Sequence, residues 1–201
     1  MEDWTEKYRP KTLRDIVGNE RALSTLRTWA GRWNQGKIPE KRAALLSGKP
    51  GTGKTSSALA LAADLGWTVL ELNASDARNE TAIKRVATAG AINETFDITG
   101  GFSPSRRGGR KLIILDEADN LYEKLDRSEA DSSLGDKGGK KAIIDTIKIT
   151  KQPIILIVND YYELIKGGGE PLKTLCTLIQ FYEVHQHQIV ELLKSICRQE
   201  N

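Results

Sequence analysis

Short apolar segments recur along the chain and predict strands that lie buried within a sheet. Most of them lack the polar alternation of a half-exposed strand, which is the pattern of strands covered on both faces in a parallel sheet. We predict such strands at residues 43–46, 68–72, 111–115, 153–158 and 174–181. The segments between them have the composition of helices and loops.

Helical patterns alternate with the predicted strands. Residues 20–33 place their apolar side chains on one face, and residues 56–65 are rich in alanine and leucine. Further segments are predicted as helices at 79–89 and 141–148, a glycine- and serine-rich loop at 90–110, and a mobile polar stretch at 126–141. The alternation predicts a three-layer α/β sandwich with a mostly parallel, five-stranded sheet.

The strongest chemical motif is a phosphate-binding loop of the form G-x-x-x-x-G-K-[ST]. Its residues are Gly48, Lys49, Pro50, Gly51, Thr52, Gly53, Lys54 and Thr55. The glycines let backbone N–H groups converge on phosphate oxygens, and the N-terminus of the following helix adds its dipole. Lys54 is placed to reach the β- and γ-phosphates, and Thr55 offers a hydroxyl to Mg²⁺. The motif lies between a predicted strand and a predicted helix, which favours nucleotide binding over a chance glycine-rich turn.

Acidic residues follow the predicted strand 111–115, where open α/β sheets bind their ligands. Asp116 would hold Mg²⁺, directly or through water, and Glu117 would polarise the water that attacks the γ-phosphate. Carboxylates at this position could instead cap the next helix. The phosphate-binding loop lies ~60 residues upstream, a spacing that fits a shared sheet and favours the hydrolytic interpretation.

Asn159 ends the predicted strand 153–158. Its amide could hydrogen-bond the attacking water or the γ-phosphate, or it could simply form a turn before Asp160. Side-chain chemistry alone leaves both interpretations open.

Composition adds limits on environment and partners. The 201 residues carry a net charge of +3, with 39% hydrophobic and 28% charged residues. No apolar run approaches the ~18 residues of a membrane span, and the two cysteines lack metal-ligand spacing. We expect a cytoplasmic, nucleoid-associated protein, or a nuclear one in a eukaryote. Basic clusters at residues 78–85 and 106–111 could attract nucleic-acid phosphates or only solvate loops, and composition leaves that question open.

Three segments together resemble conserved boxes of replication factor C subunits. They are residues 4–13 (WTEKYRPKTL) continuing into 15–18 (DIVG), residues 71–76 (ELNASD), and residues 116–119 (DEAD). That family consists of AAA+ ATPases that open a ring-shaped sliding clamp and load it onto primer–template DNA.

The resemblance implies an AAA+ sheet, ATP and Mg²⁺ as cofactors, and further site residues. Four residues of the opening segment would lie over the adenine: Tyr8, Arg9, Pro10 and Val17. Asn159 would be the sensor-1 residue of the γ-phosphate. A helix beginning near Arg78 would face the central chamber, where Arg78 and Lys84 would contact the DNA backbone.

One departure from the family pattern points to a particular subunit type. Small subunits carry a Ser-Arg-Cys box whose arginine reaches the neighbouring subunit's ATP, but here Leu175 stands at the arginine position. A leucine cannot offer the donors that stabilise a transferring phosphoryl group. We expect this chain to receive an arginine finger in trans from a small subunit and to donate none, although Lys173 could in principle substitute. Leu175 and residues 158–162 resemble the archaeal large subunit.

The resemblance also divides the chain into two domains. Residues 1–182 would form the ATP-binding domain, and residues 183–201 the first helix of a helical lid, with an apolar stripe at Ile189, Leu192, Leu193 and Ile196. Such a helix exposes its stripe unless it folds back or finds a partner. The family's lid would continue to a sensor-2 arginine and a collar, so the sequence resembles a fragment with weak turnover on its own.

Our interpretation from sequence is therefore the ATPase module of a clamp-loader large subunit, with Lys54, Glu117 and Asn159 in catalytic roles. One alternative is another AAA+ DNA-processing ATPase of the helicase or initiator type. The other is a structural scaffold subunit that binds ATP without hydrolysing it.

Overall fold

The computed structural model describes residues 3–73, 110–119 and 138–200. Within these residues, five parallel strands form one sheet in the order β2-β3-β4-β1-β5. The strands are β1 (Ala43–Ser47), β2 (Thr68–Asn73), β3 (Lys111–Asp116), β4 (Ile154–Val158) and β5 (Cys176–Gln180). The predicted five-stranded parallel sheet is confirmed.

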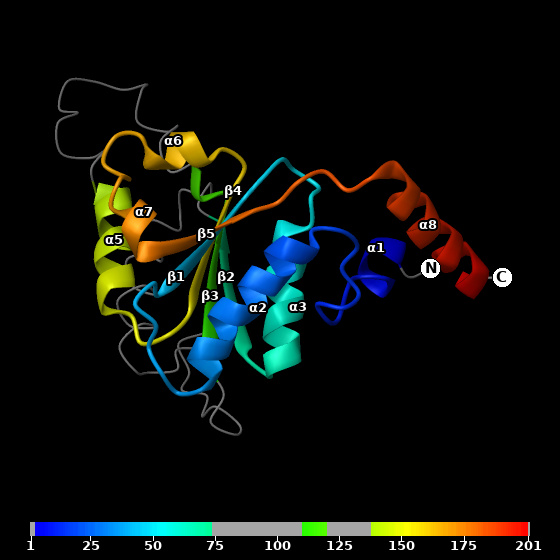
Figure 1. Ribbon diagram of the computed structural model, residues 1–201, viewed down its shortest axis with the longest axis horizontal. Helices are drawn as coiled ribbons and strands as arrows, with labels where there is room; N and C mark the ends of the chain where they lie inside the picture. The colour runs from blue at the N-terminus through cyan, green and yellow to red at the C-terminus, as the bar shows by residue number, and fades with distance from the viewer. Residues whose placement is uncertain (1–2, 74–109, 120–137, 201) are drawn as a thin grey trace.

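Helices cover both faces of the sheet and make it the middle of three layers (Figure 1). One face carries α2 (Glu20–Asn34) and α3 (Lys54–Leu65). The other carries α5 (Gly138–Ile149), α6 (Tyr161–Ile165) and α7 (Leu172–Leu175). Two further helices, α1 (Trp4–Lys7) and α8 (Gln186–Glu200), lie beside each other at one end of the molecule. The three-layer prediction is therefore correct.

The central strands are mainly apolar because both of their faces are buried. In β1, Ala44 and Leu46 enter the core beneath α2 and α3, whereas Ala43 and Leu45 enter the core beneath α5 to α7. All five residues of β1 are buried, and so are all five of β4. Alternate residues thus fill two separate cores, which explains the uninterrupted apolar runs in the sequence.

The last strand begins later than predicted, because Thr174 and Leu175 belong to α7. Pro171 precedes this helical turn, and its carbonyl accepts a hydrogen bond from the main-chain N–H of Leu175 at 3.1 Å. The Thr174 hydroxyl donates to the same carbonyl at 2.9 Å. These local bonds favour a turn over strand pairing, and β5 starts at Cys176.

The predicted mobile stretch 126–141 overlaps the start of α5, which begins at Gly138. Residues 126–137 and the predicted helix 79–89 lie outside the described residues. The helix starts early because Lys140, only 4% exposed, donates to the main-chain carbonyl oxygens of Glu163 and Lys166. Buried hydrogen bonds to another element therefore override the glycine-rich composition at this end of the stretch.

Arg110, one member of the second basic cluster, is held by the fold. Its guanidinium donates to the carbonyl of Trp33 at 2.6 Å and to that of Lys151 at 3.2 Å, and it lies over the Trp33 ring. Burial lowers the pKa of Arg110 from its ordinary value. These contacts anchor the start of β3 to α2, so this arginine has a structural role.

Candidate active site

The predicted site residues come from three neighbouring strands whose carboxyl ends lie at one edge of the sheet. The order β3-β4-β1 places the ends of these strands side by side, and Ser47 of β1 pairs with Val158 of β4. Loop residues 48–53 follow β1, the acidic segment 116–119 ends β3, and Asn159 follows β4. Parallel strands thus gather three motifs that are distant in sequence.

Two glycines of the phosphate-binding loop are required by its shape. A Cβ atom at Gly48 would lie 2.4 Å from the main-chain oxygen of Phe181, so the loop passes too close to the chain after β5 for any side chain. Gly53 has a φ of +90° and precedes the first residue of α3, without a side-chain hydrogen bond capping the helix. The loop therefore presents a helix N-terminus that can receive an anion.

The charged end of the Lys54 side chain lies within the phosphate-binding loop itself. The side chain is 6% exposed, and its Nζ donates to the carbonyl oxygens of Gly48 at 2.5 Å and Lys49 at 2.9 Å and to Oδ1 of Asn159 at 3.0 Å. Burial lowers the pKa of Lys54, while the negative charges of Asp116 and Asp119 oppose that shift. The structure therefore joins the lysine and the asparagine that were predicted to meet the same phosphate.

The two predicted Mg²⁺ ligands are in direct contact. The Thr55 hydroxyl donates to Oδ2 of Asp116 at 2.8 Å. One hydroxyl and one carboxylate fit Mg²⁺, which binds through one or two protein oxygens together with phosphate and water oxygens. In the part of the chain that the structure describes, no cluster of three or more His, Cys, Asp or Glu side chains offers a metal cage. The donor set thus suits a cation shared with a nucleotide.

Glu117 adopts a left-handed backbone conformation, with a φ of 52°. Its main-chain N–H donates to Oδ1 of Asp116 at 2.8 Å, so the carboxylate of one residue sets the backbone of the next. Non-glycine residues adopt this conformation at a cost and occur with it at functional sites more often than elsewhere. The turn directs the chain away from the strand at the residue predicted to activate water.

Asp119 contacts the site, although the sequence pattern assigned it no role. Its Oδ2 accepts hydrogen bonds from the main-chain N–H groups of Asn159 at 2.8 Å and Asp160 at 2.9 Å. The signal available in the sequence was its position three residues after Asp116, on the turn that leaves β3. Only the adjacency of β3 and β4 shows what this carboxylate contacts.

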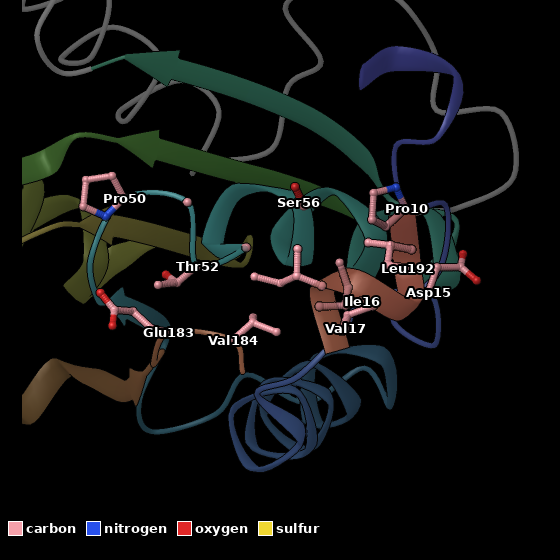
Figure 2. A pocket seen from close by; sticks show the side chains of 13 residues that line it. Pro10, Asp15, Ile16, Val17, Pro50, Thr52, Ser56, Glu183, Val184 and Leu192 are labelled. Carbon is pink, nitrogen blue, oxygen red and sulfur yellow. The ribbon is translucent and has the colours of Figure 1, made fainter. Parts of the chain in front are cut away.

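A cavity of about 540 Å³ lies beside the phosphate-binding loop, a volume within the range of small-ligand sites. The opening segment contributes Pro10, Asp15, Ile16 and Val17, the loop contributes Pro50 to Gly53, and α3 contributes Ser56. Figure 2 shows Ile16, Val17 and Leu192 close together beside α3. The cavity is thus apolar on the side away from the phosphate-binding loop, as a nucleobase requires.

The predicted adenine contacts separate into two groups. Pro10 and Val17 line the cavity, whereas Tyr8 and Arg9 do not. The Tyr8 hydroxyl donates to Glu200 at 2.5 Å, and the Arg9 guanidinium donates to Glu6 at 2.6 Å. The predicted DNA contacts Arg78 and Lys84 lie outside the described residues.

Residues near the chain's end complete the cavity, and the sequence pattern did not assign them to the site. Val184 precedes α8, and Ile189 and Leu192 lie on it, so the apolar stripe of this helix supplies one wall. Asn19 joins this end to the loop, because its side chain hydrogen-bonds the main chain of Tyr182 at 2.8 and 2.9 Å and the carbonyl of Thr52 at 3.4 Å. Helical spacing revealed the stripe, but only the fold reveals what it faces.

Leu175, which was predicted to stand where small subunits carry an arginine, packs inward. It is half-buried in α7 against the core beneath α5 to α7, while Lys173 is exposed. The leucine therefore serves packing, and it projects no charge from this surface.

The fold and the phosphate-binding site define the class of protein. The family model described as ATPase family associated with various cellular activities (AAA) matches residues 44–166, more than half of the chain. The chain belongs to the AAA family of ATPases.

Within that class, the chain is similar to replication factor C large subunits. It is 44% identical to the subunit of Natronomonas pharaonis over 100% of this chain and 36% of that protein. It is 46% identical to the subunit of Methanosarcina mazei over 98% of this chain and 28% of that protein. The predicted resemblance is confirmed, and the chain spans about a third of the length of these curated relatives.

Solved structures share the fold at low sequence identity. The Holliday junction branch migration motor RuvB of Thermotoga maritima has a TM-score of 0.61 and 16% identity, covering 93% of this chain and 53% of that one. The Orc1 protein of Aeropyrum pernix, solved with DNA, also has a TM-score of 0.61, with 21% identity over 92% of this chain and 50% of that one. These likenesses confirm the AAA+ fold.

No helix among the described residues is long and apolar enough to span a membrane.

Proposed function

We propose that this chain is the Mg²⁺-dependent ATP-binding and ATP-hydrolysing module of a clamp-loader large subunit. It would act with small subunits to load a sliding clamp onto primer–template DNA. The observation that carries the proposal is the cluster of Lys54, Thr55, Asp116 and Asn159 at the ends of β1, β3 and β4. Sequence similarity over the whole chain to replication factor C large subunits supports the clamp-loading assignment.

The residues divide the work on ATP between them. Lys54 exchanges the main-chain carbonyls of Gly48 and Lys49 for phosphate oxygens, an exchange favoured because each phosphate oxygen carries negative charge. Thr55 and Asp116 would hold Mg²⁺, which would neutralise charge on the phosphates. The apolar cavity between the opening segment and α8 takes the base.

Hydrolysis needs a base and a donor near the γ-phosphate. Glu117 accepts a proton from the attacking water, a role supported by its position directly after β3, at the sheet edge that carries the phosphate-binding loop. Asn159 turns its amide from Lys54 to the water or the γ-phosphate once Lys54 has moved. Both residues directly follow strands that are largely or wholly buried, and rigid elements of this kind hold a reacting geometry well.

The site is completed by a neighbouring subunit. Leu175 packs into the core, so this chain presents no arginine at the position from which small subunits reach a neighbour's ATP. A small subunit would supply that arginine here, a contribution worth ~10³-fold or more in turnover. Residues 183–201 would be the first helix of the lid domain, and residues 1–182 the ATP-binding domain.

A glutamine substitution tests the proposal. Glu117→Gln should keep ATP affinity within ~3-fold but abolish turnover in a mixture with small subunits, clamp and primed DNA, because an amide cannot accept the proton. Glu170→Gln, the same change at an exposed loop position, is the matched control and should leave turnover unchanged.

Two results would contradict the proposal. Wild-type turnover by the Glu117→Gln complex would remove Glu117 from the reaction and favour a scaffold that binds ATP structurally. Equal turnover by the wild-type chain with and without small subunits would show that no neighbour completes the site.

A further inference from the structure

The turn after β3 and the residues after β4 are joined by a single carboxylate, that of Asp119. The paired register of β3 and β4 runs from Ile113 with Ile154 to Leu115 with Leu156. Beyond that register, Oδ2 of Asp119 accepts the main-chain N–H groups of Asn159 and Asp160 at 2.8 and 2.9 Å. The side chain thus continues the connection between the two strands past the end of their ladder.

This connection leads directly to the phosphate-binding lysine. Asn159, whose backbone Asp119 holds, accepts a hydrogen bond from Nζ of Lys54 at 3.0 Å through its side-chain Oδ1. Three residues from three different segments therefore form one chain of contacts. Any shift of the Asn159 backbone moves the amide that faces Lys54.

The hydrogen-bond geometry of Asp119 suits a residue that fixes the main chain of Asn159 and Asp160 in place. Both N–H groups converge on the same oxygen, and hydrogen bonds to an ionised acceptor are stronger than neutral ones. The other oxygen, Oδ1, is buried and has no hydrogen-bond partner among the residues that the structure describes. Desolvating an unpaired carboxylate oxygen is unfavourable, and the two hydrogen bonds to Oδ2 offset part of that cost.

We propose that Asp119 is a positioning residue for hydrolysis, which fixes the Asn159 backbone so that its amide can act beside Lys54. It acts through Asn159 and does not touch ATP. This inference rests on the proposed function, because hydrolysis is the step that Asn159 serves.

Two substitutions separate hydrogen bonding from charge. Asp119→Ala removes the acceptor, whereas Asp119→Asn keeps one oxygen that can receive both N–H groups. In the nucleotide-free chain we expect amide hydrogen exchange at Asn159 and Asp160 to become ~10-fold faster in Asp119→Ala and to stay within ~3-fold of wild type in Asp119→Asn. Unchanged exchange in Asp119→Ala would overturn the proposal.

Turnover in the assembled complex supplies the second readout. Asp119→Ala should lower kcat by ~10-fold or more with ATP affinity within ~3-fold, and Asp119→Asn should restore most of kcat. In an Asn159→Ala background, Asp119→Ala should change kcat by less than ~3-fold, because residues that act through one another are not additive. A parallel loss of affinity and kcat, no rescue by Asp119→Asn, or full additivity would each overturn it.

The hydrogen-exchange and turnover measurements also test this inference separately from the proposed function. Absence of turnover in the wild-type mixture would contradict the proposed function. The exchange comparison would still decide whether Asp119 holds Asn159.

Discussion

The phosphate end and the base end of the candidate site are built in different ways. At the phosphate end, Lys54 begins α3 after the loop that follows β1, Asp116 ends β3 and Asn159 follows β4. These three strands are largely or wholly buried. At the base end, the cavity lies between the opening segment and α8, and α8 buries none of its residues. Exposed contacts hold that end, among them the pair of Lys49 with Glu183 at 2.8 Å.

This difference separates a well-buried half of the site from an exposed one. The strand ends are held in place by the two hydrophobic cores on either side of the sheet. Reacting groups need to be positioned precisely, and rigid elements provide this. Exposed ion pairs contribute little and can open at low cost. The wall that α8 forms therefore has less burial to stabilise it than the strand ends have.

The largest effect is expected from a substitution that leaves a void in the hydrophobic core beneath the phosphate end. Leu156 of β4 is fully buried, and Leu156→Ala should lower the free energy of unfolding by ~2–5 kcal/mol. Leu193→Ala, the same change at a 54% exposed position on α8, should cost no more than ~0.5 kcal/mol. Urea denaturation measures both. Equal losses would mean that α8 is packed as tightly as the sheet.

The next largest effect is expected from removal of the Lys54 side chain. Lys54→Ala should weaken ATP binding by ~10- to 100-fold, because it deletes charged hydrogen bonds to the phosphates. Lys148→Ala is the matched control, since that lysine is exposed on α5 and pairs only loosely with Asp145, at 3.6 Å. Calorimetric titration with ATP measures the change. Equal affinity of the two variants would place the phosphates elsewhere.

The link between the two ends is Asn19, which adopts a φ of 56° and bonds the main chain of Tyr182. Asn19→Ala should cost ~1–3 kcal/mol of unfolding free energy, because it loses these bonds and strains the backbone. Asn19→Gly tolerates the backbone conformation and should recover ~1 kcal/mol of that loss. Thermal unfolding distinguishes the two variants, and identical values would show that backbone strain plays no part.

The smallest effect is expected at the contact between the opening segment and α8. Hydrogen bonds from Lys7 and, to a smaller extent, from Tyr8 lower the pKa of Glu200. The hydrogen bond between Tyr8 and Glu200 in turn raises the pKa of Tyr8. A carboxylate with a lowered pKa stabilises the folded contact above its unfolded pKa, near 4.5, and loses that contribution as the pH falls through the lowered value. The contact is exposed, so salt should also weaken it.

Nuclear magnetic resonance of the Tyr8 ring measures this contact. The ring signals should shift below pH 4.5 in the wild-type chain, and Glu200→Gln should remove most of that shift. An unchanged titration in Glu200→Gln would assign the transition to another group.

The sequence by itself determined the sheet, its parallel direction and the phosphate-binding loop. Continuous apolar runs such as Ile154–Val158 are diagnostic because a strand buried on both faces strongly favours apolar residues. The loop was readable because its glycines meet local backbone demands that any fold must satisfy, as at Gly53. The absence of an arginine finger at Leu175, inferred from the resemblance, stays a prediction.

Only the tertiary structure decided which of these residues meet. Asp119 contacts Asn159 because β3 lies beside β4, and α8 walls the cavity because the chain after β5 returns to the opening segment. Arg110 looked like one member of a basic cluster, but packing against Trp33 made it structural. The physical reason is common to all three. Local composition sets which element a segment forms, whereas contacts between distant segments depend on strand order and on the free energy of burying both cores together.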